Sequence, residues 1–167
     1  MVTHKALLSA KEKKSEMQKS LIAEHKKTLV SIGLNIPGTI KYRCEWRCIL
    51  DEAYGDLNLV LKAVKADCII SKQIAEVTGA YYLVLSDLDP IKMKTIAVAI
   101  EERYPYRRLL DIDVYNPRGE QVHREDIGFE SRSCFICDLP AKHCMRSRSH
   151  SSDLIHLKVN SWLEMAR

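Results

Sequence analysis

Two acidic residues inside an apolar run, Asp111 and Asp113, constrain this chain more than any other feature of its sequence. One isoleucine separates them in the stretch Arg108-Leu-Leu-Asp-Ile-Asp-Val114. Because side chains alternate between the two faces of a β-strand, both carboxylates would lie on the same face. Two adjacent negative charges favour a bound cation, and Mg²⁺ held by carboxylates and substrate phosphates is a common reason for such a pair. The alternative is a strand that ends at a solvated edge with two exposed acids.

The length and charge of the chain favour a single domain, residues 1–167, with an anionic ligand or an acidic partner. A chain of 167 residues can bury a sizeable core as one domain. Its net charge of +4 is too mild to indicate nucleic-acid binding. Residues 1–27 hold seven lysines and three glutamates, so we expect a basic helical N-terminal segment there.

The sequence also predicts the compartment of the protein. No stretch approaches the roughly 20 continuous apolar residues that a membrane span needs, and the first residues lack the apolar core of a signal peptide. We therefore expect a cytoplasmic protein without a membrane partner, whose six cysteines are reduced. Cys44, Cys48 and Cys68 are expected to be buried as small apolar residues.

Apolar periodicity and turn residues predict an α+β domain. Helices are predicted where apolar side chains recur every three or four residues, or where Asp89-Pro90 marks a helix start: 9–27, 43–65, 90–103 and 152–166. Strands are predicted at 29–34, 67–75, 81–85 and 121–126, besides the strand of Asp111 and Asp113. This order indicates a mixed or antiparallel sheet with helices packed over it.

A cysteine cluster lies in residues 128–150, a segment that is otherwise polar. Cys134, Cys137, Cys144 and His150 supply three thiolates and an imidazole, the ligand set of a closed, structural Zn²⁺ site. His143 is a competing fourth ligand, and the second half of the spacing matches no standard zinc finger closely. The alternatives are reduced, partly buried cysteines in a loop and, less favoured, a catalytic cysteine, since no single thiol is marked as activated.

Taken together, the acidic strand and the cysteine segment resemble the apo-citrate lyase phosphoribosyl-dephospho-CoA transferases, also called citrate lyase holo-acyl-carrier-protein synthases (CitX). The resemblance covers nearly the whole chain and is densest from residue 100 to residue 150. The matching residues are Asn35 to Gly38, Lys41, Ile100 to Glu102, Pro105, Arg108 to Val114, Gly119, Arg124, Asp126, Gly128, Arg132, Cys134, Cys137, Ala141, Cys144, Arg146 and His150. Two positions depart from the family pattern: Arg107 stands where a glycine is usual, and Ser131 where a proline is common.

The resemblance implies a nucleotidyltransferase-like enzyme. It would transfer the prosthetic group of 2′-(5″-triphosphoribosyl)-3′-dephospho-CoA to a serine of the acyl-carrier (gamma) subunit of citrate lyase, releasing diphosphate. Asp111 and Asp113 would hold Mg²⁺ and carry catalysis. Cationic side chains would surround the triphosphate, namely Arg108, Arg124 and Lys41. Asn35 to Gly38 would present backbone N–H groups to a phosphate or turn the chain, and Arg132 and Arg146 would face either ligand or solvent.

Three other functions stay open at the level of the sequence. A related enzyme could modify the carrier protein of another lyase or decarboxylase, although the cysteine segment argues for the citrate lyase branch. A zinc-stabilised nucleic-acid-binding module is less favoured, because the net charge is mild and few aromatic residues could stack on bases. A non-catalytic partner of the lyase is also less favoured, because the acidic strand is intact.

Overall fold

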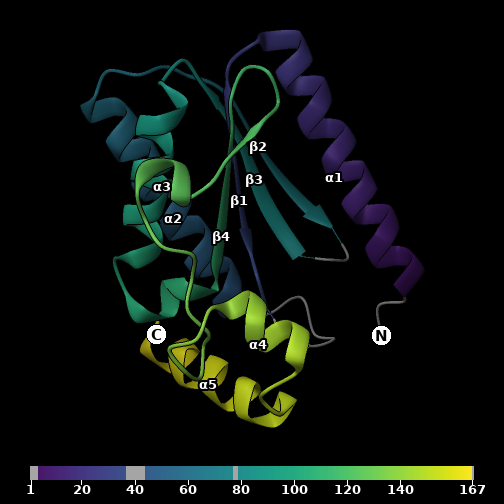
Figure 1. Ribbon diagram of the computed structural model, residues 1–167. Coiled ribbons are helices and arrows are strands. Elements are labelled where there is room, and N and C mark those ends of the chain that lie inside the picture. The colour runs from purple at the N-terminus through teal and green to yellow at the C-terminus, as the bar shows by residue number, and fades with distance from the viewer. Residues whose placement is uncertain (1–3, 37–43, 77–78, 167) are drawn as a thin grey trace.

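A five-stranded antiparallel sheet forms the centre of the structure (Figure 1). The computed structural model describes residues 4–36, 44–76 and 79–166. In chain order, the strands are β1 (Thr28–Leu34), β2 (Cys68–Glu76), β3 (Gly79–Ser86), β4 (Leu110–Tyr115) and β5 (Gln121–Val122). Their order across the sheet is β2-β3-β1-β4-β5, so β1 lies in the middle and β4 lies beside it. The predicted α+β class is confirmed, and the sheet is antiparallel throughout its described strands.

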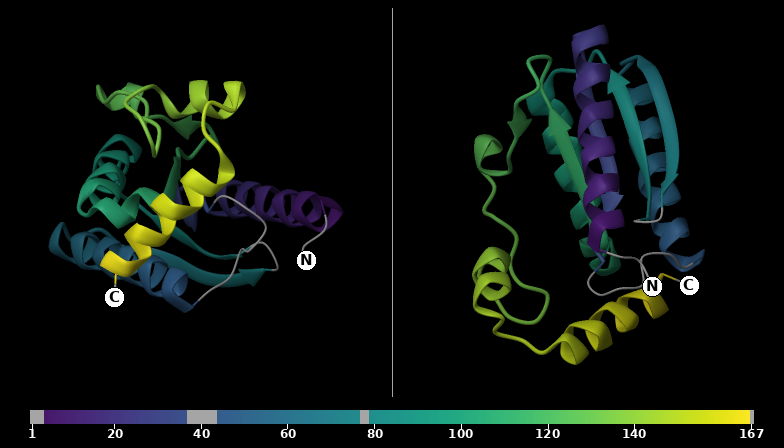
Figure 2. Two further views of the ribbon diagram at one scale, coloured as in Figure 1. Left: turned by 90° about the horizontal axis from the view of Figure 1, so that it is seen from below. Right: turned by 90° about the vertical axis from the view of Figure 1, so that its right-hand side faces the viewer.

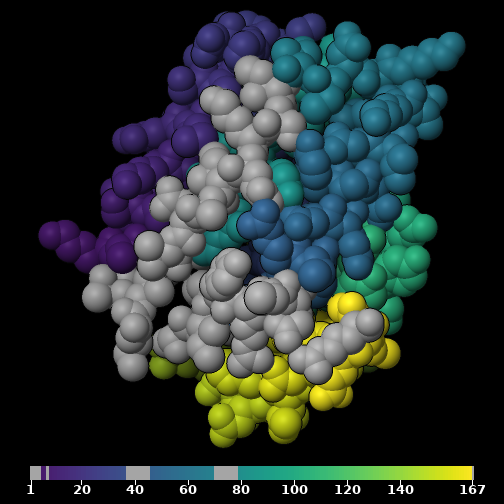
Figure 3. Space-filling model, turned by 180° about the vertical axis from the view of Figure 1, so that it is seen from behind, coloured from purple at the N-terminus to yellow at the C-terminus, as the bar shows by residue number. Residues whose placement is uncertain are grey.

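The helices are α1 (His4–His25), α2 (Cys44–Ala63), α3 (Pro90–Glu102), α4 (Ala141–Ser147) and α5 (Ser152–Met165), with short 3₁₀ turns η1 (Pro105–Leu109) and η2 (Glu125–Ile127). Figure 2 shows α1 across one face of the sheet and α2 and α3 on the other. Viewed from behind, α2 lies above the C-terminal helix α5 (Figure 3). No helix within the described ranges is long and apolar enough to cross a membrane.

Alternation along β1 gives each face of the sheet its own packing layer. Val30 and Ile32 belong to the larger core, which α2 and α3 cover with side chains such as Leu50 and Met93. On the opposite face, Leu29 packs in a smaller cluster with Leu21 and Ile22 of α1, and with apolar residues of β3. Both faces of the central strand are therefore covered, which buries β1 from Thr28 to Gly33 and leaves only Leu34 partly exposed.

The helix start predicted at Asp89-Pro90 and the turn predicted after β4 are both present in the structure. Asp89 caps α3, because its Oδ1 accepts hydrogen bonds from the backbone N–H groups of Ile91 and Lys92, both at 3.0 Å. The turn after β4 closes through a hydrogen bond from Gly119 N to Asn116 O at 2.9 Å. Gly119 adopts φ = 85°, a conformation that glycine tolerates best.

Two predictions about local structure are wrong, and one helix was not predicted. The return strand predicted at 121–126 ends at Val122, because His123 N donates to Asp126 Oδ2 at 2.8 Å and the chain turns into η2. Helix α4 was not predicted, since residues 141–147 lack apolar periodicity. Cys48 and Cys68 are exposed and not buried. The side chain of Cys44 lies outside the described residues.

Arg107 joins η1 to α2. Its side chain is only 3% exposed, and it forms ion pairs with Asp56 at 2.5 Å and Glu52 at 3.6 Å. The guanidinium also lies 5.1 Å from the ring centre of Tyr104. The position has no left-handed backbone angle, so an arginine is accommodated there. Arg107 therefore points toward α2 and serves to anchor η1.

Replacing Arg107 with methionine should lower the free energy of unfolding by about 2 kcal/mol or more, because Asp56 would keep its shielded charge without this partner. Urea denaturation followed by circular dichroism measures the change. Arg118→Met is the matched control, since the Arg118–Glu120 ion pair is exposed and contributes little. Equal stability of the two variants would contradict the anchoring role.

Candidate functional site

Asp111 and Asp113 lie on the same face of β4, as the alternating pattern predicts. The register places Asp111 opposite Gly33 and Asp113 opposite Ser31 of β1, on the side of the sheet that α1 covers. Asp111 is exposed and Asp113 is half-buried. The side-chain amide of Gln121 donates to Asp113 Oδ1 at 2.8 Å. The two carboxylates form a pair that ligands can reach through Asp111.

The groups around Asp113 shift its pKa in opposite directions. Burial raises the pKa of Asp113 above its usual value, and the neighbouring carboxylate of Asp111 raises it further. The ammonium groups of Lys14 and Lys94 act in the opposite direction. Lys14 comes from α1 and Lys94 from α3, so two different helices supply positive charge to the acidic strand.

Side chains of α3 complete the hydrogen bonding of β4 where β5 does not reach. Ile112 N donates to Glu101 Oε1 at 2.8 Å, and Lys94 Nζ donates to Ile112 O at 3.0 Å. Both side chains are buried. Burial lowers the pKa of Lys94, while the carboxylates of Glu101 and Asp113 oppose this shift. A helix thereby takes the place of a neighbouring strand at this position.

Glu101 also forms ion pairs with two of the predicted substrate-binding arginines. The carboxylate is 2% exposed, and it forms ion pairs with Arg124 at 2.6 Å and with Arg132. Arg124 reaches Glu102 at 2.7 Å with its other nitrogen. Arg132 additionally donates to the backbone oxygen of Leu110 at 2.8 Å. Both guanidinium groups are therefore fixed beside the strand that carries Asp111 and Asp113.

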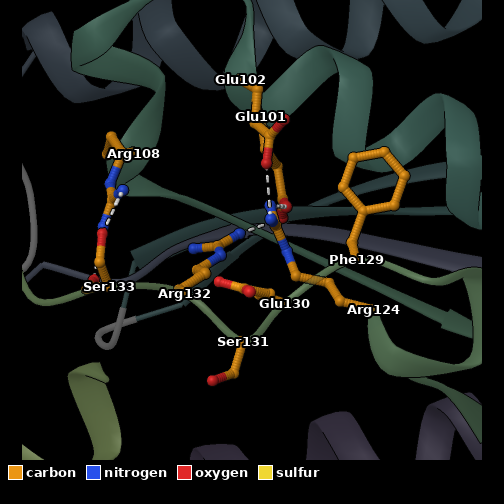
Figure 4. A pocket seen from close by; sticks show the side chains of 9 residues that line it. All are labelled: Glu101, Glu102, Arg108, Arg124, Phe129, Glu130, Ser131, Arg132 and Ser133. Carbon is orange, nitrogen blue, oxygen red and sulfur yellow. Dashed lines mark hydrogen bonds and ion pairs between the residues drawn. The ribbon is translucent and has the colours of Figure 1, made fainter. Parts of the chain in front are cut away.

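The third predicted arginine, Arg108, faces the same cavity. This arginine cavity has a volume of about 280 Å³ and is lined by charged side chains of α3, η1 and the segment 129–133, together with Arg124. Figure 4 shows these side chains, with Arg124 and Arg132 directed toward Glu101. Arg108 donates to the backbone oxygen of Ser133 at 2.6 Å and to its hydroxyl at 3.2 Å. Within the described ranges it makes no ion pair with a carboxylate. Burial lowers the pKa of Arg108, and repulsion from Arg132 and Arg124 lowers it further.

The remaining predicted ligand-binding residues are not part of this arginine cavity. Asn35 donates its backbone N–H to Leu109 O at 2.8 Å and lines a separate, more apolar cavity beside the cysteine cluster. Arg146 is exposed on α4. Gly38 and Lys41 lie outside the described residues. The structure thus brings together three of the seven residues predicted to bind substrate: Arg108, Arg124 and Arg132.

Cys134, Cys137, Cys144 and His150 converge as predicted. Their ligand atoms all lie within 4.8 Å of one another. Cys137 Sγ is 3.5 Å from Cys144 Sγ and 3.3 Å from His150 Nε2. His143 is exposed and does not belong to the cluster, so the geometry favours His150 as the fourth ligand. Three sulfur atoms and one imidazole at these distances fit a tetrahedral Zn²⁺ ion.

The cysteine cluster is connected to the arginine cavity through the backbone. Cys134 N donates to Leu139 O at 2.7 Å, and Ala141 N donates to Arg132 O at 2.8 Å. Phe135 follows Cys134 and packs edge-on against Trp162 of α5, with ring centres 4.9 Å apart. These contacts fix the segment that also carries Ser133. A metal in the cluster would therefore stabilise one wall of the arginine cavity.

The sequence alone does not predict the contacts that Lys14, Lys94 and Glu101 make near β4. Lys14 carried a signal, because positions 14, 17, 18, 21 and 22 have the spacing of one helical face and the last two are apolar residues that face the sheet. A lysine in that series must point inward as well. Lys94 and Glu101 gave no comparable signal, since charged residues in an amphipathic helix usually face solvent.

Comparison with known proteins shows which family the chain belongs to. The family model described as apo-citrate lyase phosphoribosyl-dephospho-CoA transferase (CitX) matches residues 2–166. The chain belongs to this family. It is 32% identical to a probable apo-citrate lyase phosphoribosyl-dephospho-CoA transferase of Streptococcus pyogenes, over 94% of this chain and 83% of that protein. A protein of the same name from Vibrio cholerae is 26% identical over 92% of this chain and 86% of its own length.

A longer CitX relative is also similar to this chain. The protein CitXG of Haemophilus influenzae is 28% identical over 96% of this chain. The match covers 34% of that protein, so this chain spans about a third of its length.

Cys134→Ser should release bound zinc and lower the melting temperature, because it removes one thiolate from the converging set. Elemental analysis of protein purified without added metal measures the zinc content. Cys68→Ser should retain the metal, since Cys68 is exposed on β2, away from the cluster. Less than about half an equivalent of zinc in the wild-type protein would contradict the site, because a closed structural site binds its metal tightly.

Proposed function

We propose that the protein transfers the phosphoribosyl-dephospho-CoA prosthetic group to a serine of the acyl-carrier subunit of citrate lyase. The donor in this proposal is 2′-(5″-triphosphoribosyl)-3′-dephospho-CoA, and diphosphate is the second product. Membership of the CitX family supports the class of reaction. The observation that carries the proposal further is a carboxylate pair on β4 together with an arginine cavity whose Arg132 is hydrogen-bonded to the backbone of the same strand.

The reaction substitutes one oxygen for another at phosphorus. The serine oxygen of the carrier attacks the α-phosphorus of the donor, and a new P–O bond forms in line with the bond to the β-phosphate. That second bond breaks, and diphosphate leaves with its electron pair. The serine loses its proton in the course of attack. No nucleophile from the enzyme is required, so the enzyme acts by positioning and by charge neutralisation.

Asp111 and Asp113 fit a magnesium site by the chemistry of their ligand atoms. Carboxylate oxygens are hard ligands, and the exposure of Asp111 leaves room for the water and phosphate oxygens that Mg²⁺ retains. When bound there, Mg²⁺ would neutralise charge on the phosphates and on the diphosphate leaving group. Asp113, with Gln121 on its Oδ1, is the more rigidly positioned of the two carboxylates.

The arginines differ in how much of their charge is available to the donor. Arg124 and Arg132 neutralise the buried carboxylate of Glu101, so their main contribution is to hold the cavity in shape. Arg108 makes only neutral hydrogen bonds to Ser133, and its buried Nε has no hydrogen-bond partner among the described residues. A partly buried guanidinium without a carboxylate partner favours binding of an anionic ligand. We therefore assign the principal contact with the donor phosphates to Arg108.

The cysteine cluster has a structural role in this proposal. Zn²⁺ bound by three cysteines and His150 would fix the segment around Ser133 and thus the orientation of Arg108. The thiols must stay reduced to bind metal, which fits the predicted cytoplasmic location. Lys41, Gly38, Asn35 and Arg146 remain predicted ligand-binding residues.

Asp111→Asn and Asp113→Asn should each reduce diphosphate release in the presence of apo carrier, donor and Mg²⁺ by at least about a hundredfold, because each removes a charged metal ligand. A coupled colorimetric assay for diphosphate measures the rate, and thermal melting verifies the fold. Asp153→Asn, which changes an exposed aspartate at the start of α5, is the control and should keep the wild-type rate. If either active-site variant keeps more than about a tenth of the rate at saturating Mg²⁺, the metal assignment is wrong.

A further inference from the structure

Lys14 occupies an inward position of α1 that an apolar residue would normally fill. Positions 14, 17, 18, 21 and 22 follow the three-four spacing of one helical face. Gln18, Leu21 and Ile22 are buried against the sheet, and Met17 packs against the same cluster. Lys14 continues this series by one turn and is partly buried. Its ammonium is therefore directed over the sheet and away from the solvated side of the helix.

The ammonium lies above β1, between β3 and β4. A Cβ atom built on Gly33 would be 3.7 Å from Lys14 Nζ, so the missing side chain at Gly33 leaves room for the amine. On one side, Nζ is 5.0 Å from the ring centre of Tyr81 on β3. On the other side lies β4, where Asp111 is the register partner of Gly33. Lys14 thus lies on the same face of the sheet as the carboxylate pair, above the neighbouring strand β1.

Electrostatic coupling links Lys14 to both carboxylates. Burial lowers the pKa of Lys14, and the charges of Asp113 and Asp111 oppose that shift. Among the described residues, the ammonium makes no direct ion pair with either carboxylate. Lys94 is the other lysine coupled to Asp113, and its ammonium is hydrogen-bonded to Ile112 O. Lys14 is therefore the lysine whose charge is free to act on a ligand at the pair.

The charge balance of the site depends on what binds to it. Lys14 and Lys94 offset the charges of Asp111 and Asp113, and Arg124 and Arg132 offset those of the nearby Glu101 and Glu102, so the group is close to neutral by itself. A divalent cation on Asp111 and Asp113 would create an excess of positive charge beside Lys14, which disfavours the metal alone. Phosphate oxygens bound to that cation would restore the balance and would find Lys14 beside them. Metal and phosphate should consequently bind together more tightly than either binds alone.

We propose that Lys14 is a phosphate-binding residue of the active site, which makes metal binding at Asp111 and Asp113 dependent on the polyphosphate ligand. This inference rests on the proposed function and adds to it a residue from α1, an element that the arginine cavity does not include. It gives α1 a role beyond covering one face of the sheet.

The test measures binding by calorimetry with Mn²⁺ as the metal and inorganic diphosphate as the anion. Lys14→Met should bind Mn²⁺ alone about threefold to tenfold more tightly than the wild type, because a repelling charge has been removed. The same variant should bind diphosphate in the presence of Mn²⁺ about tenfold more weakly, because a cationic ligand of the phosphates has been lost. Lys14→Arg should restore most of the diphosphate affinity.

Opposite changes in the two affinities distinguish this role from a structural one. Lys19→Met, an exposed lysine of the same helix, should change neither affinity. If Lys14→Met loses the folded state in thermal melts, Lys14→Gln carries the same comparison. Affinities for Mn²⁺ and diphosphate that are unchanged in the folded variant would overturn the proposal. So would a variant in which both affinities fall together.

The binding measurements, taken together with an assay of carrier modification by the wild-type protein, separate this inference from the proposed function. If wild-type protein fails to modify the carrier but Lys14→Met still shows the opposite changes, the transfer reaction is wrong and the phosphate site stands. If the wild type modifies the carrier and Lys14→Met binds both probes as the wild type does, the transfer reaction stands and the role of Lys14 is wrong.

Discussion

The buried carboxylate of Glu101 is the interaction on which the rest of the site depends. It accepts the backbone N–H of Ile112 and forms ion pairs with Arg124 and Arg132. A buried carboxylate is costly unless several donors surround it, so these partners are required together. One side chain thereby attaches α3 to β4 and holds two guanidinium groups next to the acidic strand. The position of the arginine cavity follows from this attachment.

Positive charge near β4 is divided between groups that build the site and groups that can act on a ligand. Arg124, Arg132 and Lys94 are committed to buried protein partners. Arg108 of η1 and Lys14 of α1 have no direct carboxylate partner within the described ranges. In the proposed function, Lys14 would contact phosphate chelated to a metal on Asp111 and Asp113, and Arg108 would bind phosphate in the arginine cavity. In the proposed function, this division would allow a nearly neutral set of residues to bind a strongly anionic donor.

Much of the fold could be predicted because its signals are local. The acidic strand follows from alternation, the start of α3 from Asp89-Pro90, and the convergence of the cysteines from the ligand set and spacing. Helix α4 was missed because contacts of Cys144 with the cluster, and not apolar periodicity, determine its position. The exposure of Cys48 and Cys68 was missed because residue type alone does not say which face of an element is covered.

The proximity of some predicted site residues could be anticipated from the sequence, and that of others could not. Residue type and family resemblance indicated Arg108, Arg124 and Arg132, and all three line one cavity. Glu101 and Lys94 could not be assigned, because their roles arise from the packing of α3 against the edge of β4, which no local pattern encodes. Lys14 was counted among the lysines of a basic segment, although its spacing relative to Leu21 and Ile22 directs it inward.

The most direct test of the proposed function is the mass of the carrier protein itself. Purified protein would be incubated with apo acyl-carrier subunit, triphosphoribosyl-dephospho-CoA and Mg²⁺, and the intact carrier would be weighed by mass spectrometry. The proposed function predicts an increase equal to one phosphoribosyl-dephospho-CoA group, located on a serine, with one diphosphate released per modified carrier. An unchanged carrier mass, with donor and metal in excess, would contradict it.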